Sequence, residues 1–221
     1  MRVSREKSAE TRERILDVAA TLFRERGFDG IGLADIMKAA GLTHGGFYKH
    51  FGSKDDLEAQ ATGVALATKA ADWVRLIEHA AARPLSALTE EYLSPRHRDH
   101  PGKGCALAAL GADVARQGER VRSAFTAGLE PFLQLLSNAI PGRSKAVRRR
   151  KAIATMAELI GTLILARAVD DPALSDEILA ATSLNLSEVS GGSRVDEIRT
   201  EPGTGRAPTR VGTDRKCGEI S

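Results

Sequence analysis

The residues best suited to do chemistry lie together in the segment 41–51, whose sequence is GLTHGGFYKHF. It combines hydroxyl, imidazole and ammonium groups with two adjacent glycines, which let another surface come close to the backbone. Such groups hydrogen-bond to the phosphates and base edges of nucleic acid. A second candidate is the thiol of Cys105, which directly follows the sequence Gly102-Lys103-Gly104.

A helix-turn-helix would position the first set of groups. Apolar residues at helical spacing precede it, and Gly41 can take the left-handed conformation that ends a helix. Thr43 can then cap a second short helix, on which Phe47 and Phe51 form one apolar face. The opposite face presents the donors. Two short helices joined by a glycine-containing turn are typical of a helix-turn-helix whose second helix enters a DNA major groove.

This region resembles the DNA-binding domain of the tetracycline-repressor (TetR) family. The residues that carry the resemblance are 14–23 (RILDVAATLF), 27–28 (GF), 35–36 (DI), 40–42 (AGL), 47–48 (FY) and 51–54 (FGSK). The chain departs from the family at Ile31-Gly32, where members commonly have a Thr or Ser pair that contacts phosphate. A hydroxyl-to-phosphate contact is therefore missing before the first of the two short helices.

The resemblance implies an all-α fold, with an N-terminal helix-turn-helix three-helix domain and a C-terminal helical ligand-binding and dimerisation domain. We place the first domain in residues 1–54 and the second in residues 55–187. Residues 188–221 lose helical periodicity and fill with Gly, Ser, Thr, Pro and mixed charge, so we expect a disordered tail.

Seven residues form the predicted DNA contact set: Thr43, His44, Gly45, Tyr48, Lys49, His50 and Lys54. We assign Tyr48 and Lys54 to phosphates, and Thr43 to the DNA backbone. His44, Gly45 and Lys49 are the better candidates for base edges. For His44 and His50, the alternative that they are only polar surface residues stays open.

The charge distribution agrees with this placement. The chain of 221 residues has a net charge of +3, and the whole excess of Lys and Arg lies in residues 1–54. A basic module on a neutral body suits a phosphate-binding end, although chance clustering of a small excess would look the same. Arg5 and Lys7 precede a first helix expected over residues 8–26, in an arm that either lies along phosphates or is simply solvated.

Composition excludes several other classes of protein. Only 4% of residues are aromatic, and Ala and Leu dominate the apolar set, which favours helices. No apolar run reaches the roughly 20 residues of a membrane span, and the N-terminus lacks a signal-peptide core. We therefore expect a cytoplasmic protein, with no membrane association, whose two cysteines, Cys105 and Cys217, are thiols.

The second domain begins with a helix capped by Ser53 and expected to run from residue 54 to about 82. A short helix from Pro84 to about residue 93, a loop over 94–104 and a helix starting at Cys105 follow. Pro131 should kink the next helix, 119–140. The helices near 144–169 and 172–186 have broad apolar surfaces, so we predict that they form a homodimer interface of four helices; burial within the monomer is the alternative.

An effector pocket would lie between the helices of this domain. Its predicted lining is Trp73, Ile77, Cys105, Leu107, Leu110, Phe125 and Phe132, although ordinary helical cores are lined in the same way. At a helix N-terminus beside Lys103, Cys105 should favour the thiolate and react with electrophiles or oxidants, unless it is a small buried apolar thiol.

Two further groups of residues carry no assigned chemistry. His97, Asp99, His100 and Cys105 do not have the spacing of a compact metal site, so we expect neither a metal nor a cofactor. The run Arg148-Arg149-Arg150-Lys151 could touch DNA or acidic lipid, but cations suit the early turns of a helix poorly. We interpret it as a solvated face.

Together these observations predict a ligand-responsive transcriptional repressor, not an enzyme. It would bind a double-stranded palindromic DNA operator as a homodimer and be released by a small-molecule or electrophile effector of unknown identity. One alternative is a small thiol-dependent enzyme using Cys105, with His97 or His100 as its base. Another is a constitutive DNA-binding protein without an effector.

Overall fold

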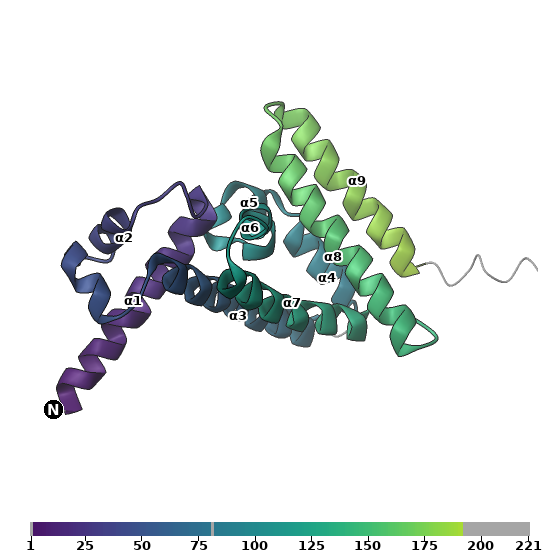
Figure 1. The fold of residues 1–221 in the computed structure, drawn as a ribbon. Helices are drawn as coiled ribbons and strands as arrows, with labels where there is room; N and C mark the ends of the chain where they lie inside the picture. The colour runs from purple at the N-terminus through teal and green to yellow at the C-terminus, as the bar shows by residue number, and fades with distance from the viewer. Residues whose placement is uncertain (1, 81, 192–221) are drawn as a thin grey trace, which may run out of the picture. The chain divides into compact units, whose positions relative to one another are not determined.

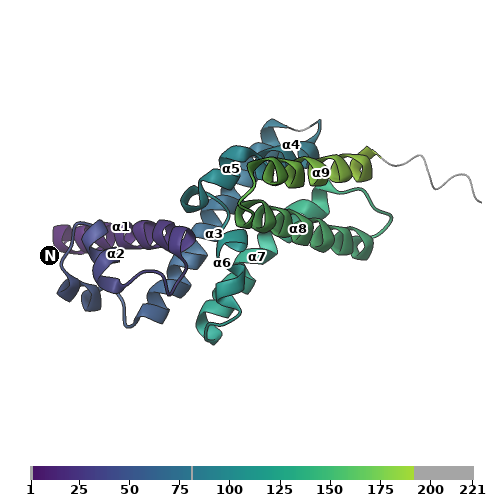
Figure 2. The same ribbon diagram turned by 90° about the horizontal axis from the view of Figure 1, so that it is seen from above.

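The computed structural model describes residues 2–80 and 82–191, and every regular element in these ranges is helical. Residues up to Ser190 form one compact unit. Figure 1 shows the order of the helices along the chain, and Figure 2 shows the same arrangement from above. The all-α prediction is confirmed. Most of the predicted tail, from residue 192 onward, lies outside the described residues.

The first helix, α1, spans Arg2–Arg26 and begins earlier than predicted. Arg5 and Lys7 are exposed residues of the helix itself, so the expectation of a separate arm ahead of it is wrong. The segment 2–7 contains no Gly or Pro, and its Arg, Glu and Lys residues are good helix formers, so nothing stops the helix before residue 2. Ile15, Ala19 and Phe23 form its fully buried stripe.

The helix-turn-helix consists of α2 (Leu33–Ala39) and a 3₁₀ helix, η1 (His44–Lys49). Gly41 lies between them with φ +71°, as predicted from its sequence position. Its N–H donates to the carbonyl of Lys38 at 3.0 Å, and that of Leu42 donates to Met37 at 2.9 Å. This pair of hydrogen bonds is the Schellman motif, which satisfies the last free carbonyls of a helix.

The second short helix differs from the prediction in its winding and its cap. Thr43 occupies the N-cap position, but its side chain makes no cap hydrogen bond. Instead, its carbonyl accepts from the N–H of Gly46 at 3.0 Å, which is the i to i+3 bond of a 3₁₀ turn. Gly45 and Gly46 have low α-helix propensity, which favours this tighter turn. The predicted apolar face is present, because the buried rings of Phe47 and Phe51 stack 5.6 Å apart.

A long helix, α3 (Lys54–His79), follows directly and is about 39 Å long. Ser53 caps it as predicted, accepting from the N–H of Asp56 at 3.0 Å. The carboxylate of Asp56 in turn accepts from the N–H of Gly52 at 3.2 Å, so the first turn is tied to the preceding loop. The helix packs against α1 and, further along, against α4 and α7. The predicted domain boundary near residue 54 falls at its first residue and stays a prediction.

The segment predicted as a loop over 94–104 contains two short helices, so that prediction is wrong. After α4 (Pro84–Tyr92), α5 spans Pro95–Asp99 and η2 spans Pro101–Lys103. Each begins at a proline, whose fixed φ suits the first helical position, and Ser94 caps α5 through the N–H of His97. The following helix, α6 (Ala106–Val114), has Cys105 at its N-cap position, as predicted.

The last three helices are α7 (Glu119–Ala139), α8 (Lys145–Ala168) and α9 (Pro172–Gly191). α7 continues through Pro131, whose side chain is exposed. α8 and α9 lie side by side in Figures 1 and 2, joined by a 2.9 Å hydrogen bond between the hydroxyls of Thr162 and Thr182. Since α9 extends to residue 191, the predicted start of the tail at 188 is too early.

The basic run at the start of α8 is largely engaged with its own surroundings. Arg149 pairs with Glu130 of α7 through two 2.6 Å hydrogen bonds. Arg148 and Lys151 donate to backbone carbonyls of the preceding turn, at 3.2 and 3.3 Å. These contacts agree with a role as a solvated face that fixes the α7–α8 turn.

Candidate functional site

The predicted DNA contact residues lie mainly on η1 and its cap. Thr43, His44, Gly45 and Lys49 are exposed, and Tyr48 has 66% of its surface exposed. The Tyr48 ring packs edge-on against buried Phe47, with centroids 5.1 Å apart. The aromatic ring is therefore anchored while its hydroxyl faces solvent. His50 differs from the others because it is half-buried at the end of the helix.

The glycine at position 45 is not required by packing within the chain. A Cβ built there would meet nothing within 4 Å, whereas one at Gly46 would touch the Met37 side chain at 3.7 Å. Neither glycine has a positive φ. Because the protein itself leaves this space open, a partner's surface can approach the backbone at position 45 closely.

Lys54 is held by the protein more firmly than its predicted phosphate contact suggests. Its ammonium donates to the carbonyl of Phe28 at 2.6 Å and lies 3.4 Å from the carboxylate of Glu58. Glu58 is buried, and burial raises the pKa of its carboxyl group despite the nearby Lys54 charge. Lys54 thus joins the start of α3 to the turn after α1.

Further contacts fix η1 and the start of α3 against the rest of the molecule. The guanidinium of Arg12 lies over the Phe51 ring, 5.1 Å from its centroid, and also donates to Gln60 of α3. On α7, Arg120 donates to Asp56 at 3.1 Å. The end of the helix-turn-helix and the start of α3 are therefore held by contacts with both α1 and α7.

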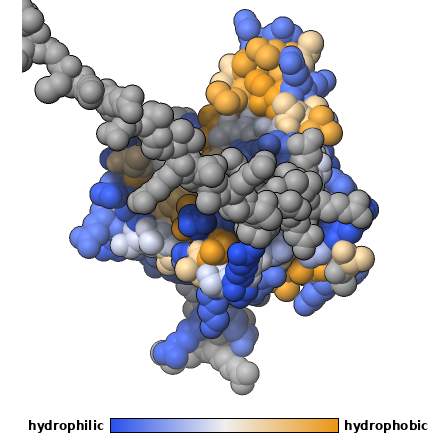
Figure 3. Space-filling model, turned by 90° about the vertical axis from the view of Figure 1, so that its right-hand side faces the viewer, coloured by the Kyte–Doolittle hydropathy of each residue, from blue (hydrophilic) through white to orange (hydrophobic). Residues whose placement is uncertain are grey.

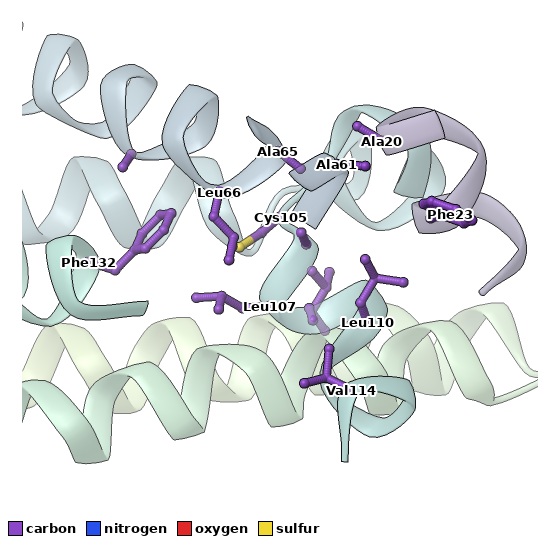
Figure 4. Close-up of a cluster of buried hydrophobic side chains, with 14 of the residues drawn as sticks. Ala20, Phe23, Ala61, Ala65, Leu66, Cys105, Leu107, Leu110, Val114 and Phe132 are labelled. Atoms are coloured by element: carbon purple, nitrogen blue, oxygen red, sulfur yellow. The ribbon is translucent and has the colours of Figure 1, made fainter. Parts of the chain in front are cut away.

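The seven predicted effector-contact residues mostly form packed core. Cys105, Leu107, Leu110 and Phe132 are buried, as Figure 4 shows for the cluster around them. Trp73 is also buried and borders an open cavity of about 380 Å³ beside α3, and Ile77 and Phe125 are partly buried against the core. Their role in effector binding stays a prediction, and their observed role is packing.

The backbone of Cys105 is hydrogen-bonded to the ring of His97, a contact that the sequence analysis did not predict. The backbone N–H of Cys105 donates to Nε2 of His97 at 2.9 Å, and Nδ1 of His97 lies 2.7 Å from the carbonyl of Tyr92. This pattern requires the neutral ring with its proton on Nδ1. Burial lowers the pKa of His97 from its usual 6.5 to about 4, so the ring stays neutral at neutral pH.

The predicted thiolate character of Cys105 is not supported. The thiol is fully buried, and burial raises its pKa. The backbone amides of Leu107 and Ala108, at the start of α6, lower the pKa as the helix-terminus argument requires, but desolvation outweighs them. Figure 4 shows the sulfur among apolar side chains, beside Leu66. Cys105 is thus a protonated core thiol in this conformation.

The hydroxyl of Tyr92 is the one buried side-chain oxygen or nitrogen without a nitrogen or oxygen partner among the described residues. It lies against the Cys105 thiol, and burial raises its pKa well above the usual value. A sulfur is a weak hydrogen-bond partner, so this contact leaves a polar group poorly satisfied in the core.

Two arginines hold the segment around Cys105 in place. Arg24 of α1 donates through Nε to the carbonyl of Gly102 at 2.9 Å. Arg167 of α8 donates to the carbonyls of His97 and Arg98 at 2.7 and 3.0 Å. Sequence reasoning missed both, because each partner is a backbone carbonyl about 70 to 80 residues away in the chain.

The glycines on either side of Lys103 have a packing reason. A Cβ at Gly104 would lie 2.8 Å from the His97 ring, and one at Gly102 would lie 2.3 Å from a Glu25 carboxylate oxygen. At Gly104 the neighbour is a buried ring held by hydrogen bonds, so glycine is needed there, whereas the exposed Glu25 side chain beside Gly102 can move away. Two glycines separated by one residue can indicate a closely packed segment. The prediction of a loop over residues 94–104 did not take this into account.

The arrangement does not favour the enzyme or metal alternatives. His97 directs Nε2 at the backbone of Cys105 and so is not placed as a base for its thiol, and His100 is exposed, with Nδ1 2.9 Å from the Arg96 carbonyl. Within ranges 2–80 and 82–191, no three His, Cys, Asp or Glu side chains converge as metal ligands would. No helix in the same ranges is long and apolar enough to cross a bilayer.

Comparison with known proteins identifies the family. Residues 15–61 match the sequence profile of bacterial regulatory proteins of the tetR family. The HTH-type transcriptional repressor NemR of Escherichia coli K12 is 32% identical over 139 residues, which cover 59% of this chain and 67% of NemR. The chain belongs to the TetR family.

Other TetR relatives match over shorter stretches or in fold alone. The HTH-type transcriptional regulator AcrR of Shigella flexneri is 46% identical over 56 residues, a quarter of this chain and 26% of AcrR. A crystal structure of E. coli NemR in its reduced form superposes with a TM-score of 0.68 and 23% identity, over 81% of this chain and 96% of that one. A TetR-family regulator from Agrobacterium tumefaciens gives a TM-score of 0.67 at 20% identity, over 80% and 98% of the two chains. These relatives are transcriptional regulators and not enzymes.

The buried His97 makes the stability of the protein depend on pH. Its pKa is about 4 when folded and about 6.5 when unfolded, so the unfolded state binds the proton more readily. The stability due to the neutral ring is complete above pH 6.5 and is lost as the pH falls towards 4. The loss is about 3 kcal/mol.

Urea unfolding between pH 4 and 7.5 should show that wild type loses this much more stability than His97→Gln. His100→Gln, which replaces an exposed histidine, is the control and should lose as much stability as wild type over this pH range. If wild type and His97→Gln lose equal stability, His97 is not the group responsible for the pH dependence.

Labelling with iodoacetamide tests the state of Cys105. In a Cys217→Ser background, the folded protein should label slowly near pH 7, because the thiol is buried and protonated. His97→Ala removes the acceptor of the Cys105 N–H and opens space beside it, so labelling should accelerate at least tenfold. His100→Ala is the matched control and should leave the rate unchanged. Rapid labelling of the unaltered site would show that Cys105 is reactive as the sequence predicted.

Proposed function

We propose that this protein is a ligand-responsive transcriptional repressor that binds a palindromic DNA operator as a homodimer. The observation that carries the proposal is the exposed, donor-bearing surface of η1, whose opposite face is anchored in the core by Phe47 and Phe51. The relative NemR is named a repressor, which supports the sign of regulation. Belonging to the TetR family supports operator binding and dimerisation in general.

On DNA, we propose that η1 lies in the major groove with its exposed face towards the bases. Gly45 permits close approach, and His44 and Lys49 are exposed on the same short helix. Tyr48 has the reach and the free hydroxyl for a phosphate, and its ring is already ordered by Phe47. Lys54 adds positive potential near the helix start, although its ammonium already has two protein partners.

The helix α2 contributes less than is usual for the family. Gly32 is its N-cap and provides no side-chain cap, and Ile31 is buried in the core. Neither can donate a hydroxyl to phosphate. We therefore propose that affinity depends more strongly on η1 and on the basic surface of residues 1–54.

We propose that α8 and α9 form the dimer interface. Their exposed large apolar residues are Ile153, Ile164, Leu165, Leu174 and Leu184. Figure 3 shows an apolar patch at the height where α8 and α9 meet in Figure 1. A Cβ at Gly161 would meet nothing within 4 Å, so a second helix can approach there. A second copy with the same patch would cover it by two-fold symmetry, giving the four-helix arrangement predicted from sequence.

Release by an effector requires that the ligand bind the DNA-competent and the released states with different affinity. α3 supports this coupling because its first turn adjoins η1 and its later turns lie in the core around Trp73. The two predicted effector classes are a reversible small molecule and an electrophile. An electrophile could react with Cys105 only after this buried thiol became exposed. A reversible small ligand needs no such step, and we propose it as the ordinary effector.

Footprinting tests the DNA-binding proposal directly. The purified protein should protect a discrete palindrome on fragments that include its own upstream region, with half-sites about 34 Å apart or a multiple of this. Protection should weaken as salt is raised from 50 to 200 mM. Gly45→Ala should keep the unfolding free energy within about 0.5 kcal/mol but lower operator affinity roughly tenfold, since a methyl group enters the space left for DNA.

Gly63→Ala is the matched control, because its added Cβ also meets nothing within 4 Å but lies on α3. It should leave operator affinity unchanged. Binding that is salt-sensitive but lacks sequence preference would favour a constitutive DNA-binding protein. No protection even at low salt would overturn the proposal.

Sedimentation equilibrium tests the dimer interface. The double variant Leu165→Gln, Leu184→Gln removes two apolar side chains that are 56% and 65% exposed in the single chain. If these residues are covered by a second copy, the dissociation constant of the dimer should rise at least tenfold. Val74→Gln, at an exposed apolar residue of α3, should leave it unchanged. An unchanged dimer in the double variant would place the interface elsewhere.

A further inference from the structure

A cavity of about 240 Å³ lies between α1, α3 and η2, and it shares Lys69 and Asp72 with the open cavity beside Trp73. Its polar lining contains more cations than anions. The side chains of Arg24, Lys69 and Lys103 border it, together with those of Asp17 and Asp72. Asp72 is already paired with Arg75 of the next turn, so its charge is partly neutralised. The net charge of the lining suits a ligand with a single negative charge.

Arg24 is the most constrained of these cations. It is half-buried, and burial lowers the pKa of its guanidinium, which means that the charge is poorly solvated. Two of its nitrogens donate to the carbonyl of Gly102, which is a neutral acceptor. The nearby Glu25 carboxylate acts on this charge through space, but among the described residues no carboxylate forms an ion pair with Arg24. A bound anion would supply a directly paired countercharge and a stronger acceptor.

The remaining wall of the cavity is apolar or weakly polar. Ala20 of α1 and Val64 and Ala65 of α3 provide the apolar part, and Thr21 and Thr68 add methyl and hydroxyl groups. The volume is somewhat below the usual range of ligand pockets, which suits a small metabolite rather than a large aromatic compound. A cationic end beside a short apolar wall matches a carboxylate attached to a short aliphatic chain.

We propose that this cavity binds a small aliphatic monocarboxylate and that this ligand is an effector of the protein. The proposal rests on the proposed repressor function and assigns the class and the site of its ligand. The carboxylate lies against Arg24 and Lys69, and the aliphatic chain lies along Ala20 and Val64. Lys103 closes the outer side.

The position of Arg24 explains how such a ligand would reach the DNA-binding end. Arg24 belongs to α1, the same helix whose Arg12 holds Phe51 behind η1. A carboxylate that takes donors of Arg24 from the Gly102 carbonyl weakens the link between α1 and η2. The conformation that holds the ligand then differs from the ligand-free one in the placement of α1, which alters the support of η1. Operator affinity falls in proportion to the difference in ligand affinity between the two states.

Titration calorimetry of the full chain with sodium hexanoate tests the proposal without DNA. Hexanoate should bind, and hexanamide, its neutral analogue, should not. Lys69→Met should weaken hexanoate binding at least tenfold, because it removes one of the cations at the carboxylate. Lys145→Met, at an exposed lysine of α8, is the matched control and should leave binding unchanged. Saturating hexanoate should lower operator affinity of the wild type at least tenfold, and hexanamide should not.

Several results would overturn the proposal. Absence of hexanoate binding in a protein that still protects its operator would overturn this inference and leave the repressor function intact. Hexanoate binding that is insensitive to Lys69→Met would place the ligand elsewhere. Inorganic phosphate binding as tightly as hexanoate, with the same sensitivity to Lys69→Met, would show a general anion site. A ligand-free wild type that binds no operator would overturn the proposed function, while the calorimetry would still report on the cavity.

Discussion

The continuity of α3 is the constraint on which the rest of the structure depends. One uninterrupted helix runs from Lys54, beside the helix-turn-helix, to His79, and its later turns pack against α4 and α7. Leu57 at one end and Leu66 and Trp73 further along are all fully or almost fully buried, so each end has its own apolar contacts. Because a hydrogen-bonded helix resists bending, a displacement at one end is carried to the other. The Ser53 cap and the hydrogen bond from Lys54 to the Phe28 carbonyl fix the position of the start of α3 beside the helix-turn-helix.

The features that could be predicted from the sequence are those that depend on near neighbours. Gly41 is needed for a left-handed turn, Phe47 and Phe51 share a face because they are four residues apart, and Ser53 caps the helix that it precedes. In each case the interacting groups lie within five residues, and the same geometry recurs wherever such residues occur. The family resemblance extended this local information to the fold of the whole chain.

The features that could not be predicted depend on groups far apart in the chain. Arg24 bonds to a carbonyl of Gly102, and Arg167 to carbonyls beside His97, and a backbone carbonyl leaves no trace in a sequence. Cys105 shows the same limit in another form. The local argument, a thiol at a helix N-terminus, identified a real effect of the α6 amides on its pKa. It failed because desolvation by distant core residues is larger, and burial is not a local property.

One row of aromatic rings gives the protein an intrinsic optical reporter. Trp73, the single tryptophan of the chain, packs edge-on against Phe132 at 4.9 Å and against Tyr92 at 5.9 Å, and Tyr92 in turn packs against His97 at 4.7 Å. The indole therefore lies one ring away from the histidine that holds Cys105. Because no other tryptophan contributes to the signal, the fluorescence emission of Trp73 reports on the packing beside the α6 N-terminus. Rearrangements of that region can be followed in the unlabelled protein, in solution and in real time.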